Sequence, residues 1–424
     1  MIPNAQGRAL AVLNRVAQAH WPDRLKLRKA FEKLLYSGTR AGFRLAARRA
    51  RKASRPGRAD DLFDLSLSDE QRMLVDMLES FALDTLRPAA HEADARGAVP
   101  AALLNQAHGL GLAHYGVGER LGGLAGDRTI LTNALMAEAL AKGDLSLAAA
   151  LLAPLSAANC IRRWASPEQQ AAWLPAFLAA EPAPPMAIAV SEPALLFDPL
   201  KLDTRARRKG RHYLLNGEKC LVVNGLDASR LLLAAETGDG PALFMVEAGS
   251  QGLELRPEPA MGLKACATAR ISLRGVKVSA EHRLAAVDFD YQAFLDLSHL
   301  AWCALALGTA QAALDQVIAY CNQRTAFGEP ISHRQGVAFP IADMAIELDA
   351  MRLMVWRACS RADRGEAFLR EAYLARLFCA EKAMKIGTDA VQLLGGHGFT
   401  QEHPVERWYR DLRAIALVSG GLQL

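Results

Sequence analysis

The spacing of the hydrophobic residues changes twice along the chain, and this change limits the folds that the sequence can adopt. From about residue 67 to about 180 the apolar residues follow a helical spacing, as in 130–140. Between about 186 and 280 the spacing shortens to two, for example in 270–274. After about 286 a long helical spacing returns. The sequence therefore predicts helices, then a small β domain, then helices again.

Short strand-like runs and turn-forming pairs alternate inside the predicted β domain. The runs are 213–216, 230–235 and 242–248. Asn-Gly and Asp-Gly pairs adopt the backbone conformations of tight turns at low cost. Such pairs are Asn216-Gly217, Asn224-Gly225 and Asp239-Gly240. Each pair is predicted to form a turn between strands.

Two local patterns predict features of individual helices. Gln71 lies three residues after Ser68, which is the spacing of a capping box, so a helix is predicted to begin after Ser68. Met344, Leu348, Met351 and Met354 recur at helical spacing. This second pattern predicts core packing rather than a functional surface.

Composition excludes several classes of protein. The chain has 424 residues, of which 51% are hydrophobic and 22% charged, as in an ordinary globular protein with a large core. No apolar run approaches the roughly 18 residues of a membrane-spanning helix, and no apolar signal-peptide core lies near the start. The seven cysteines form no CxxC pair, which argues against a disulfide framework or a zinc site. These features predict a cytoplasmic location, with the first segment able to bring the protein to a membrane surface.

Residues 1–58 carry the positive charge of the chain. They hold 15 Lys and Arg residues but only Asp23 and Glu32, a balance of +13, whereas the rest has 35 basic and 43 acidic residues, a balance of −8. Five arginines recur at helical spacing: Arg40, Arg44, Arg48, Arg51 and Arg55. Residues 1–60 are therefore predicted to form a basic helical extension. It would suit an anionic membrane, a polyanion such as nucleic acid, or a partner chain, while a solvated face and a transit peptide are the alternatives.

A first motif spans Arg324 to Gln335, which reads RTAFGEPISHRQ. Arg324 offers a rigid fork of donors that suits a pyrophosphate. Phe327 and Gln335 can hold an adenine or the edge of a ribityl chain. A second motif spans Gln392 to Phe399, which reads QLLGGHGF. Its paired glycines let backbone amides approach a cofactor closely.

Together the two motifs resemble the R-x-x-F-G-x-P-I/L-x-x-x-Q and Q-x-x-G-G-x-G-Y/F signatures of the acyl-CoA dehydrogenase family. The resemblance covers about residues 65–424. It implies a mainly α fold with a central β domain. The expected parts are an N-terminal helical domain (65–185), a central β-barrel domain (186–285) and a C-terminal four-helix bundle (286–424).

The resemblance also implies a chemistry and an assembly. Family members use FAD to dehydrogenate an acyl-CoA thioester between Cα and Cβ, usually as a dimer of dimers. In that assembly Arg324 and Gln335 would reach FAD held mainly by a neighbouring subunit. The residues that the resemblance assigns to the cofactor are Ser191, Arg324, Phe327, Gln335, Gln392, Gly395 and Gly396.

The residues that would perform the chemistry depart from the family pattern. The family's catalytic base is a Glu, and alignment on Arg410-Asp411 places Ser419 at its position. In a minority of members the Glu stands on another helix, where this chain has Ser298. An un-ionised serine cannot accept the α proton without a partner base. His299 is the rescue candidate, because Asp296 would lie about 200° away around the helix.

The residues expected around the flavin ring are altered as well. The family stretch T-E-P-x-x-G-S-D appears as SEPALLFD, which keeps a hydroxyl at Ser191 but places Leu196 and Phe197 where the family has Gly and Ser. Val223 stands where a Thr is expected near flavin N5, and the neighbouring Trp is absent. The ring pocket is therefore expected to be weakened.

Two functions are compatible with these residues. One is an FAD-dependent acyl-CoA dehydrogenase with a shifted or rescued base. The other is a non-catalytic family member, which acts as the silent subunit of a heteromer with an intact homologue or as a CoA-ester binding module. The chain keeps Arg324, Gln335 and Gln392 although its ring pocket is altered, and this combination matches the non-catalytic function.

Overall fold

The first described helix begins where its capping signal predicts. Ser68 accepts a hydrogen bond from the backbone N–H of Gln71, and the Gln71 side chain accepts one from the N–H of Ser68. The computed structural model describes residues 66–126, 128–179, 185–284 and 288–424, which belong to one unit, Leu65–Leu424. The predicted basic extension, residues 1–60, lies outside the described residues.

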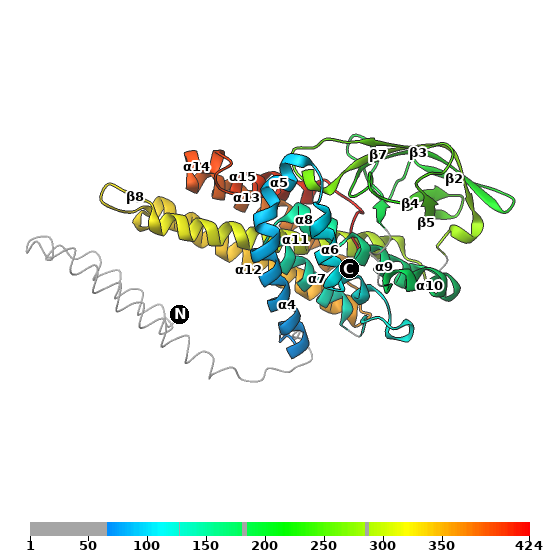
Figure 1. Ribbon diagram of the computed structural model, residues 1–424, viewed down its shortest axis with the longest axis horizontal. Helices are drawn as coiled ribbons and strands as arrows, with labels where there is room; N and C mark the ends of the chain where they lie inside the picture. The colour runs from blue at the N-terminus through cyan, green and yellow to red at the C-terminus, as the bar shows by residue number, and fades with distance from the viewer. Residues whose placement is uncertain (1–65, 127, 180–184, 285–287) are drawn as a thin grey trace, which may run out of the picture. The chain divides into compact units, whose positions relative to one another are not determined.

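Helices rich in Ala and Leu form the first part of this unit (Figure 1). They are α4 (Asp69–Phe81), the π-helical turn η1 (Ala82–Leu86), α5 (Arg87–Arg96), α6 (Ala101–Gly109), α7 (Thr129–Ala141), α8 (Leu145–Leu151), α9 (Ala153–Trp164) and α10 (Pro167–Trp173), with 3₁₀ turns η2 (Leu112–Gly116), η3 (Glu119–Leu121) and η4 (Leu174–Phe177). Helix α7 is almost wholly buried. It is apolar on every side because it packs between α4 and the long helices that follow the sheet.

A seven-stranded sheet forms the middle of the unit. Its strands are β1 (Met186–Ala189), β2 (Arg205–Lys209), β3 (His212–Val222), β4 (Arg230–Thr237), β5 (Gly240–Glu247), β6 (Leu253–Pro257) and β7 (Ala269–Ser279), with 3₁₀ turns η5 (Lys264–Cys266) and η6 (Ala280–His282). The order is β1-β4-β2-β3-β7-β6, and β5 pairs with β4. Along β7, Ile271 and Leu273 point into a core that belongs to the sheet, as the alternating pattern predicts.

One of the three predicted turns is wrong. Asn224-Gly225 and Asp239-Gly240 do connect strands, but Asn216-Gly217 lies inside β3. The pairing of β3 with β7 shifts register there, which makes a β-bulge. Glycine is required because φ is +148° and a Cβ would lie 2.5 Å from the hydroxyl oxygen of Thr204.

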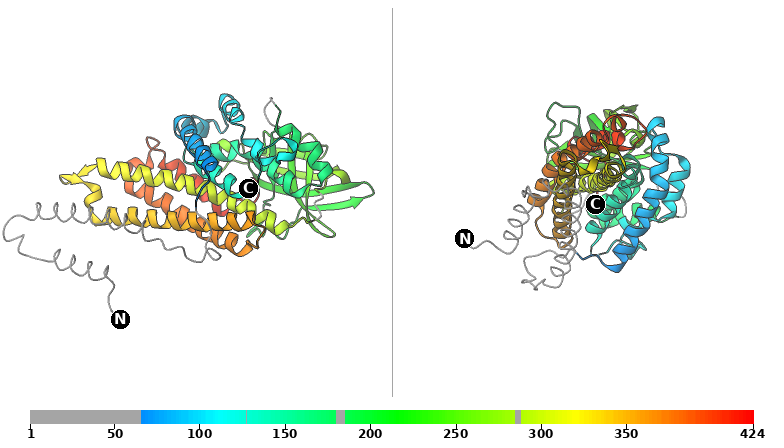
Figure 2. Two further views of the ribbon diagram at one scale, coloured as in Figure 1. Left: turned by 90° about the horizontal axis from the view of Figure 1, so that it is seen from below. Right: turned by 90° about the vertical axis from the view of Figure 1, so that its left-hand side faces the viewer.

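Long helices make up the last part of the unit. They are α11 (Tyr291–Gln323), α12 (Gln335–Asp363) and α13 (Leu369–Leu394), followed by α14 (Gly396–Phe399), α15 (Val405–Leu412) and the 3₁₀ turn η8 (Arg413–Ala416). A hairpin of β8 (Thr325–Ala326) and β9 (Glu329–Pro330), with the 3₁₀ turn η7 (Ile331–His333), connects α11 to α12. Helices α11, α12 and α13 lie side by side, and α15 packs against α11 and α13 (Figure 2).

The apolar side chains of these long helices are used for packing. Met344, Leu348 and Met351 are at most 1% exposed, and Met354 is partly buried against the same core, which confirms the predicted core packing. Helix α11 is long and apolar enough to cross a membrane by composition, but 89% of its most apolar window is buried inside the protein. Its composition is therefore that of a core helix. All seven cysteines are buried and free.

Candidate functional site

The residues at the two predicted base positions meet in the structure. Ser298 and His299 lie near the start of α11, and Ser419 follows η8. The Nε2 atom of His299 and the Oγ atom of Ser419 are 3.2 Å apart. The Ser298 hydroxyl donates to the carbonyl oxygen of Gly420 over 3.1 Å. The positions that the family's two alternative bases occupy thus belong to one cluster.

Ser191 joins this cluster from the end of β1. Its hydroxyl donates to the carbonyl oxygen of Ser419 over 2.9 Å and accepts from the Ser419 N–H over 3.1 Å. Ser191 is 3% exposed, so its donor and its acceptor are both satisfied inside the protein. The hydroxyl that the resemblance assigns to the flavin is therefore bonded to Ser419.

The backbone after Ser419 is held by two further elements. The indole N–H of Trp302 donates to the carbonyl oxygen of Gly420 over 2.8 Å. The N–H of Gly421 donates to the carbonyl oxygen of Ile188 over 2.9 Å, next to an antiparallel bridge between Ala189 and Gly420. The segment thus pairs with β1 on one side and contacts α11 on the other.

His299 is the one titratable side chain bonded to Ser419 among the described residues, and its surroundings make it a weak base. Burial, together with the neighbouring guanidinium of Arg376, lowers the pKa of His299 to about 3. In the described part of the chain no hydrogen bond or ion pair joins a carboxylate to Ser419, Ser298 or His299. Asp296 instead accepts from the Gln292 side chain over 3.1 Å. The predicted orientation of Asp296 away from the cluster is confirmed.

Lowering the pH below 6.5 is expected to destabilise the protein in part through His299. The pKa of His299 is about 3 in the folded chain and 6.5 ordinarily, so between these values the unfolded chain binds more protons. The free energy of unfolding therefore falls as the pH falls through this window. In H299Q the side chain at position 299 is uncharged at every pH, so this variant should lose less stability as the pH falls. Urea unfolding of both proteins at pH 7, 6 and 5 measures the difference, and parallel losses would contradict the assignment.

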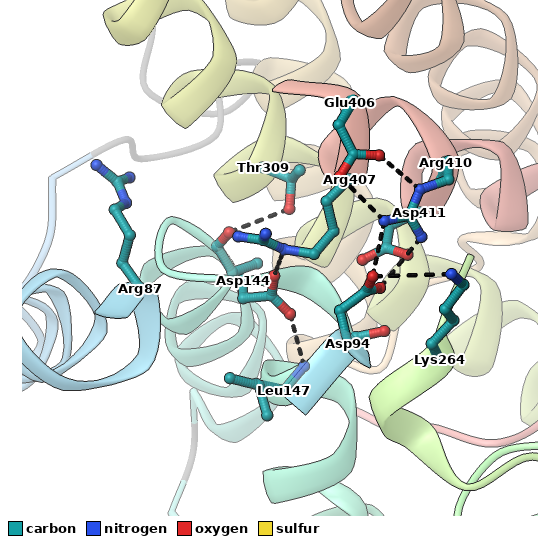
Figure 3. Close-up of polar contacts among 12 residues, drawn as sticks. Arg87, Asp94, Asp144, Leu147, Lys264, Thr309, Glu406, Arg407, Arg410 and Asp411 are labelled. Atoms are coloured by element: carbon teal, nitrogen blue, oxygen red, sulfur yellow. Dashed lines mark hydrogen bonds and ion pairs between the residues drawn. The ribbon is translucent and has the colours of Figure 1, made fainter. Parts of the chain in front are cut away.

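Buried ion pairs hold α15, the helix that precedes Ser419 (Figure 3). The Nε atom of Arg407 lies 2.7 Å from a carboxylate oxygen of Asp144, and the two side chains are 6% and 1% exposed. Arg410 donates to both carboxylate oxygens of Asp94 and also to Glu406. Helix α15 is thereby tied to α5 and to the start of α8.

Asp411 ties α15 to the loop before η5. It accepts the N–H of Leu263 over 2.7 Å, and Gly262 passes so close that a Cβ would lie 2.4 Å from the carbonyl oxygen of Arg410. Burial, followed by the charge of Asp144, raises the pKa of Asp411 above the usual range of a carboxyl group. The Arg410-Asp411 pair is therefore a structural anchor for α15.

The residues predicted to hold a dinucleotide lie at the other end of α11. Arg324 follows its last residue, Gln335 begins α12, and Phe327 between them is 95% exposed at the tip of the hairpin. The second motif is adjacent, because the Tyr320 hydroxyl lies 2.9 Å from Nδ1 of His397. The predicted cofactor residues in the two motifs are partly or fully exposed: Arg324, Phe327, Gln335, Gln392, Gly395 and Gly396.

The two groups of predicted site residues are far apart within one chain. Ser298 and Arg324 are 26 positions apart along the line of α11, which corresponds to about 39 Å at 1.5 Å per residue. Figure 1 shows the hairpin at β8 at one end of the bundle and the sheet at the other. The structure therefore brings the members of each group together but keeps the groups separate.

The ring-side residues make their contacts with the chain's own backbone. The Ser191 hydroxyl is bonded to Ser419, and the Ile188 carbonyl is bonded to Gly421. Val223 is covered too, since a Cβ on Gly421 would lie 3.4 Å from it. The polar groups and the apolar surface that would meet the ring are already in contact with the chain itself. The predicted cofactor roles of these residues stay predictions.

Sequence reasoning missed three residues of the cluster. Trp302 lies one helical turn after Ser298, and this spacing could have identified it from the sequence. Arg376 on α13 donates to the carbonyl oxygen of Val418 over 3.0 Å, and Asn159 on α9 donates to that of Gln423 over 3.1 Å. No sequence signal marks these two, because their partners are backbone carbonyls far along the chain.

Comparisons with known proteins cover nearly all of the described residues. Residues 68–181, 187–276 and 291–423 match the N-terminal, middle and C-terminal domains of acyl-CoA dehydrogenase. The mitochondrial short-chain specific acyl-CoA dehydrogenase of Homo sapiens is 32% identical over 366 residues, which is 84% of this chain and 88% of the relative.

Solved structures show the same fold. Butyryl-CoA dehydrogenase from Megasphaera elsdenii superposes with a TM-score of 0.76 at 30% identity, over 83% of this chain and 95% of that one. An FAD complex of PigA has a TM-score of 0.76 at 27% identity, over 84% and 96%. The predicted fold class is confirmed. The chain belongs to the acyl-CoA dehydrogenase family.

Proposed function

We propose that this chain is a non-dehydrogenating member of the family, the silent subunit of an assembly with an intact homologue. The observation that carries the proposal is the cluster of Ser419, Ser298 and His299, which offers no carboxylate among the described residues. A positioned base typically contributes a factor of about 10²–10⁴ to the rate. A histidine whose pKa is about 3 is a poor substitute for it near neutral pH. The ring-side contacts made by Ser419 and Gly421 support the same conclusion.

The role of such a subunit is to complete the flavin site of its neighbour. Arg324, Phe327 and Gln335 lie at the hairpin and keep the family pattern, although the ring-side residues of the same chain do not. Their exposure at this end of the bundle supports a contact with the dinucleotide of an adjacent chain. FAD is the cofactor that this arrangement implies, with the intact homologue as the chain that holds most of it.

An apolar face on the bundle supports assembly. Phe339, Ile346 and Leu353 are spaced by seven on α12 and are 61%, 67% and 46% exposed. Tyr373 and Leu377 are spaced by four on α13 and are 62% and 57% exposed. Residues at these spacings share one face of a helix, and apolar faces of this kind mark protein interfaces.

A dehydrogenase is the second candidate, and the contact between His299 and Ser419 favours it. At 3.2 Å the imidazole could take a proton that the serine hydroxyl relays from the α carbon of an acyl-CoA thioester. The low pKa of His299 opposes this role, because a base that weak holds a proton poorly.

Two further parts of the proposal concern the location of the protein in the cell and the partner of its first segment. We propose a cytoplasmic location and, for residues 1–58, docking on an anionic membrane, a polyanion or a partner chain. The +13 balance of that segment supports the second part. These residues lie outside the described part of the chain.

The test is an assembly of this chain with an intact homologue that has Glu at the position of Ser419. The R324Q variant should release FAD from the assembly about tenfold faster or more, because a charge-assisted hydrogen bond to the pyrophosphate is lost. R274Q removes an exposed arginine on β7 and is the matched control. Stopped-flow dilution monitored by flavin fluorescence gives the rates. Equal rates for R324Q and R274Q would contradict the proposed role.

A further inference from the structure

The outer face of the sheet carries positive charge without counter-charges among the described residues. Along β2, Ala206 points into the core of the sheet, whereas Arg205, Arg207 and Lys209 lie on the opposite face and are exposed. The turn that follows adds Arg211, which is exposed too. In the described part of the chain, no ion pair joins these four cations to a carboxylate. The strand therefore presents unpaired charge to the solvent.

The neighbouring strands extend this surface. Arg207 lies across from Leu214 on β3, and Leu214 lies across from Lys277 on β7, so the three residues form one row. Lys209 begins the next row, across from His212. Lys277 is exposed and, like the cations of β2, makes no ion pair within the described ranges. We call this surface the basic face, and its cations are Arg205, Arg207, Lys209, Arg211 and Lys277.

The charges become balanced further along the same strands. Arg270 on β7 is paired with Glu218 and Glu258, and Arg256 on β6 is paired with Glu254. The surplus is thus confined to the end of the sheet at which β2 turns into β3. Figure 1 shows β2 and β3 at the opposite end of the unit from the β8–β9 hairpin. The basic face is therefore separate from the exposed residues of that hairpin.

The fold itself gains little from this charge. Like charges spaced by two on one face of a strand lie about 7 Å apart and repel each other. Charges on an edge strand do prevent pairing with other chains, but Lys277 lies on β7, with β3 between it and β2. A partner of opposite charge explains the basic face better than stability does.

We propose that the basic face docks on an anionic membrane surface, where its lysine and arginine side chains bind phospholipid headgroups. Clusters of about four to eight Lys and Arg residues recognise such headgroups. The arginine fork suits a phosphate group. Residues 59–424 have a balance of −8, so their other surfaces are repelled and the basic face turns toward the membrane. The inference goes beyond the proposed function, because it requires neither FAD nor an intact homologue.

Two observations favour a membrane over a nucleic acid. In the described strands, the rows of the basic face hold no Phe, Tyr or Trp on which bases could stack, since Tyr213 points into the core of the sheet. Residues 1–58 combine their balance of +13 with apolar residues such as Phe31, Leu34 and Phe43, which suit the boundary of a bilayer. A membrane can therefore bind two basic parts of one chain at once, which strengthens the attachment.

Cosedimentation of the full chain with vesicles tests the proposal. The vesicles contain phosphatidylcholine and phosphatidylserine in a ratio of about two to one. The variant R205Q/R207Q/K209Q should bind them about 100-fold more weakly, because each cation near such a surface contributes a factor of about five. All three side chains are exposed, so the substitutions should leave Tm unchanged.

A matched control removes the same amount of charge elsewhere. R72Q/R96Q/R120Q replaces three exposed arginines on the first helices and should bind within about threefold of the unmodified chain. Equal losses in the two triple variants, or no loss in either, would overturn the proposal.

Two further measurements complete the test. K277Q alone should weaken vesicle binding about fivefold, and an unchanged affinity would contradict the proposal even if R205Q/R207Q/K209Q failed to fold. A DNA duplex offered in place of the vesicles separates the two polyanions. If R205Q/R207Q/K209Q loses affinity for the duplex but keeps its affinity for the vesicles, the basic face binds nucleic acid and the proposal is wrong.

Discussion

Replacing Arg407 by methionine is expected to lower the free energy of unfolding by about 3–5 kcal/mol, the usual cost of removing one partner of a buried ion pair. Asp144 is 1% exposed at its side chain and has Arg407 as its only ion-pair partner among the described residues. The variant would leave that carboxylate buried without a counter-charge. Urea unfolding monitored by far-UV circular dichroism measures the loss.

The double variant R407M/D144N separates this effect from lost packing. The asparagine that D144N introduces can still accept the N–H of Leu147 as the N-cap of α8, while the buried charge would be gone. The double variant should therefore recover about half or more of the stability that R407M loses. If it is as unstable as R407M, the loss comes from packing around Arg407, and the electrostatic explanation is wrong.

Local signals predicted much of the fold. The capping box at Ser68, the alternation along β7 and the methionine stripe on α12 each depend on neighbours close in sequence, and each is confirmed. Asn216-Gly217 was predicted as a turn and forms a bulge instead. That outcome depends on the approach of Thr204 and on the register with β7, which local sequence does not encode.

The candidate site was predictable in its members but not in its contacts. Two independent alignments pointed to Ser419 and Ser298, and the structure brings them to one cluster with His299. The hydrogen bonds between Ser191 and Ser419 and the burial of Leu422 could not be predicted. Both depend on backbone hydrogen bonds between segments more than 200 residues apart, such as the one from Gly421 to Ile188.

Dehydrogenation by this chain is expected to be slower than that of an intact homologue by a factor of about 10² or more. The reason is that neither Ser419 nor Ser298 supplies a carboxylate, since a positioned base contributes about 10²–10⁴ to such rates. That range corresponds to roughly 3–5.5 kcal/mol of barrier at 1.36 kcal/mol per factor of ten. His299 is expected to restore little of it, because burial and the charge of Arg376 lower the pKa of His299 to about 3.

The most direct measurement is enoyl-CoA formation by the purified chain, saturated with FAD and given octanoyl-CoA and an artificial electron acceptor. The intact homologue serves as the reference, and H299Q tests the histidine that contacts Ser419. The rate should lie at least about 10²-fold below the reference and should not change in H299Q. A rate within about tenfold of the reference that H299Q abolishes would contradict the account and would identify the chain as a dehydrogenase that uses His299.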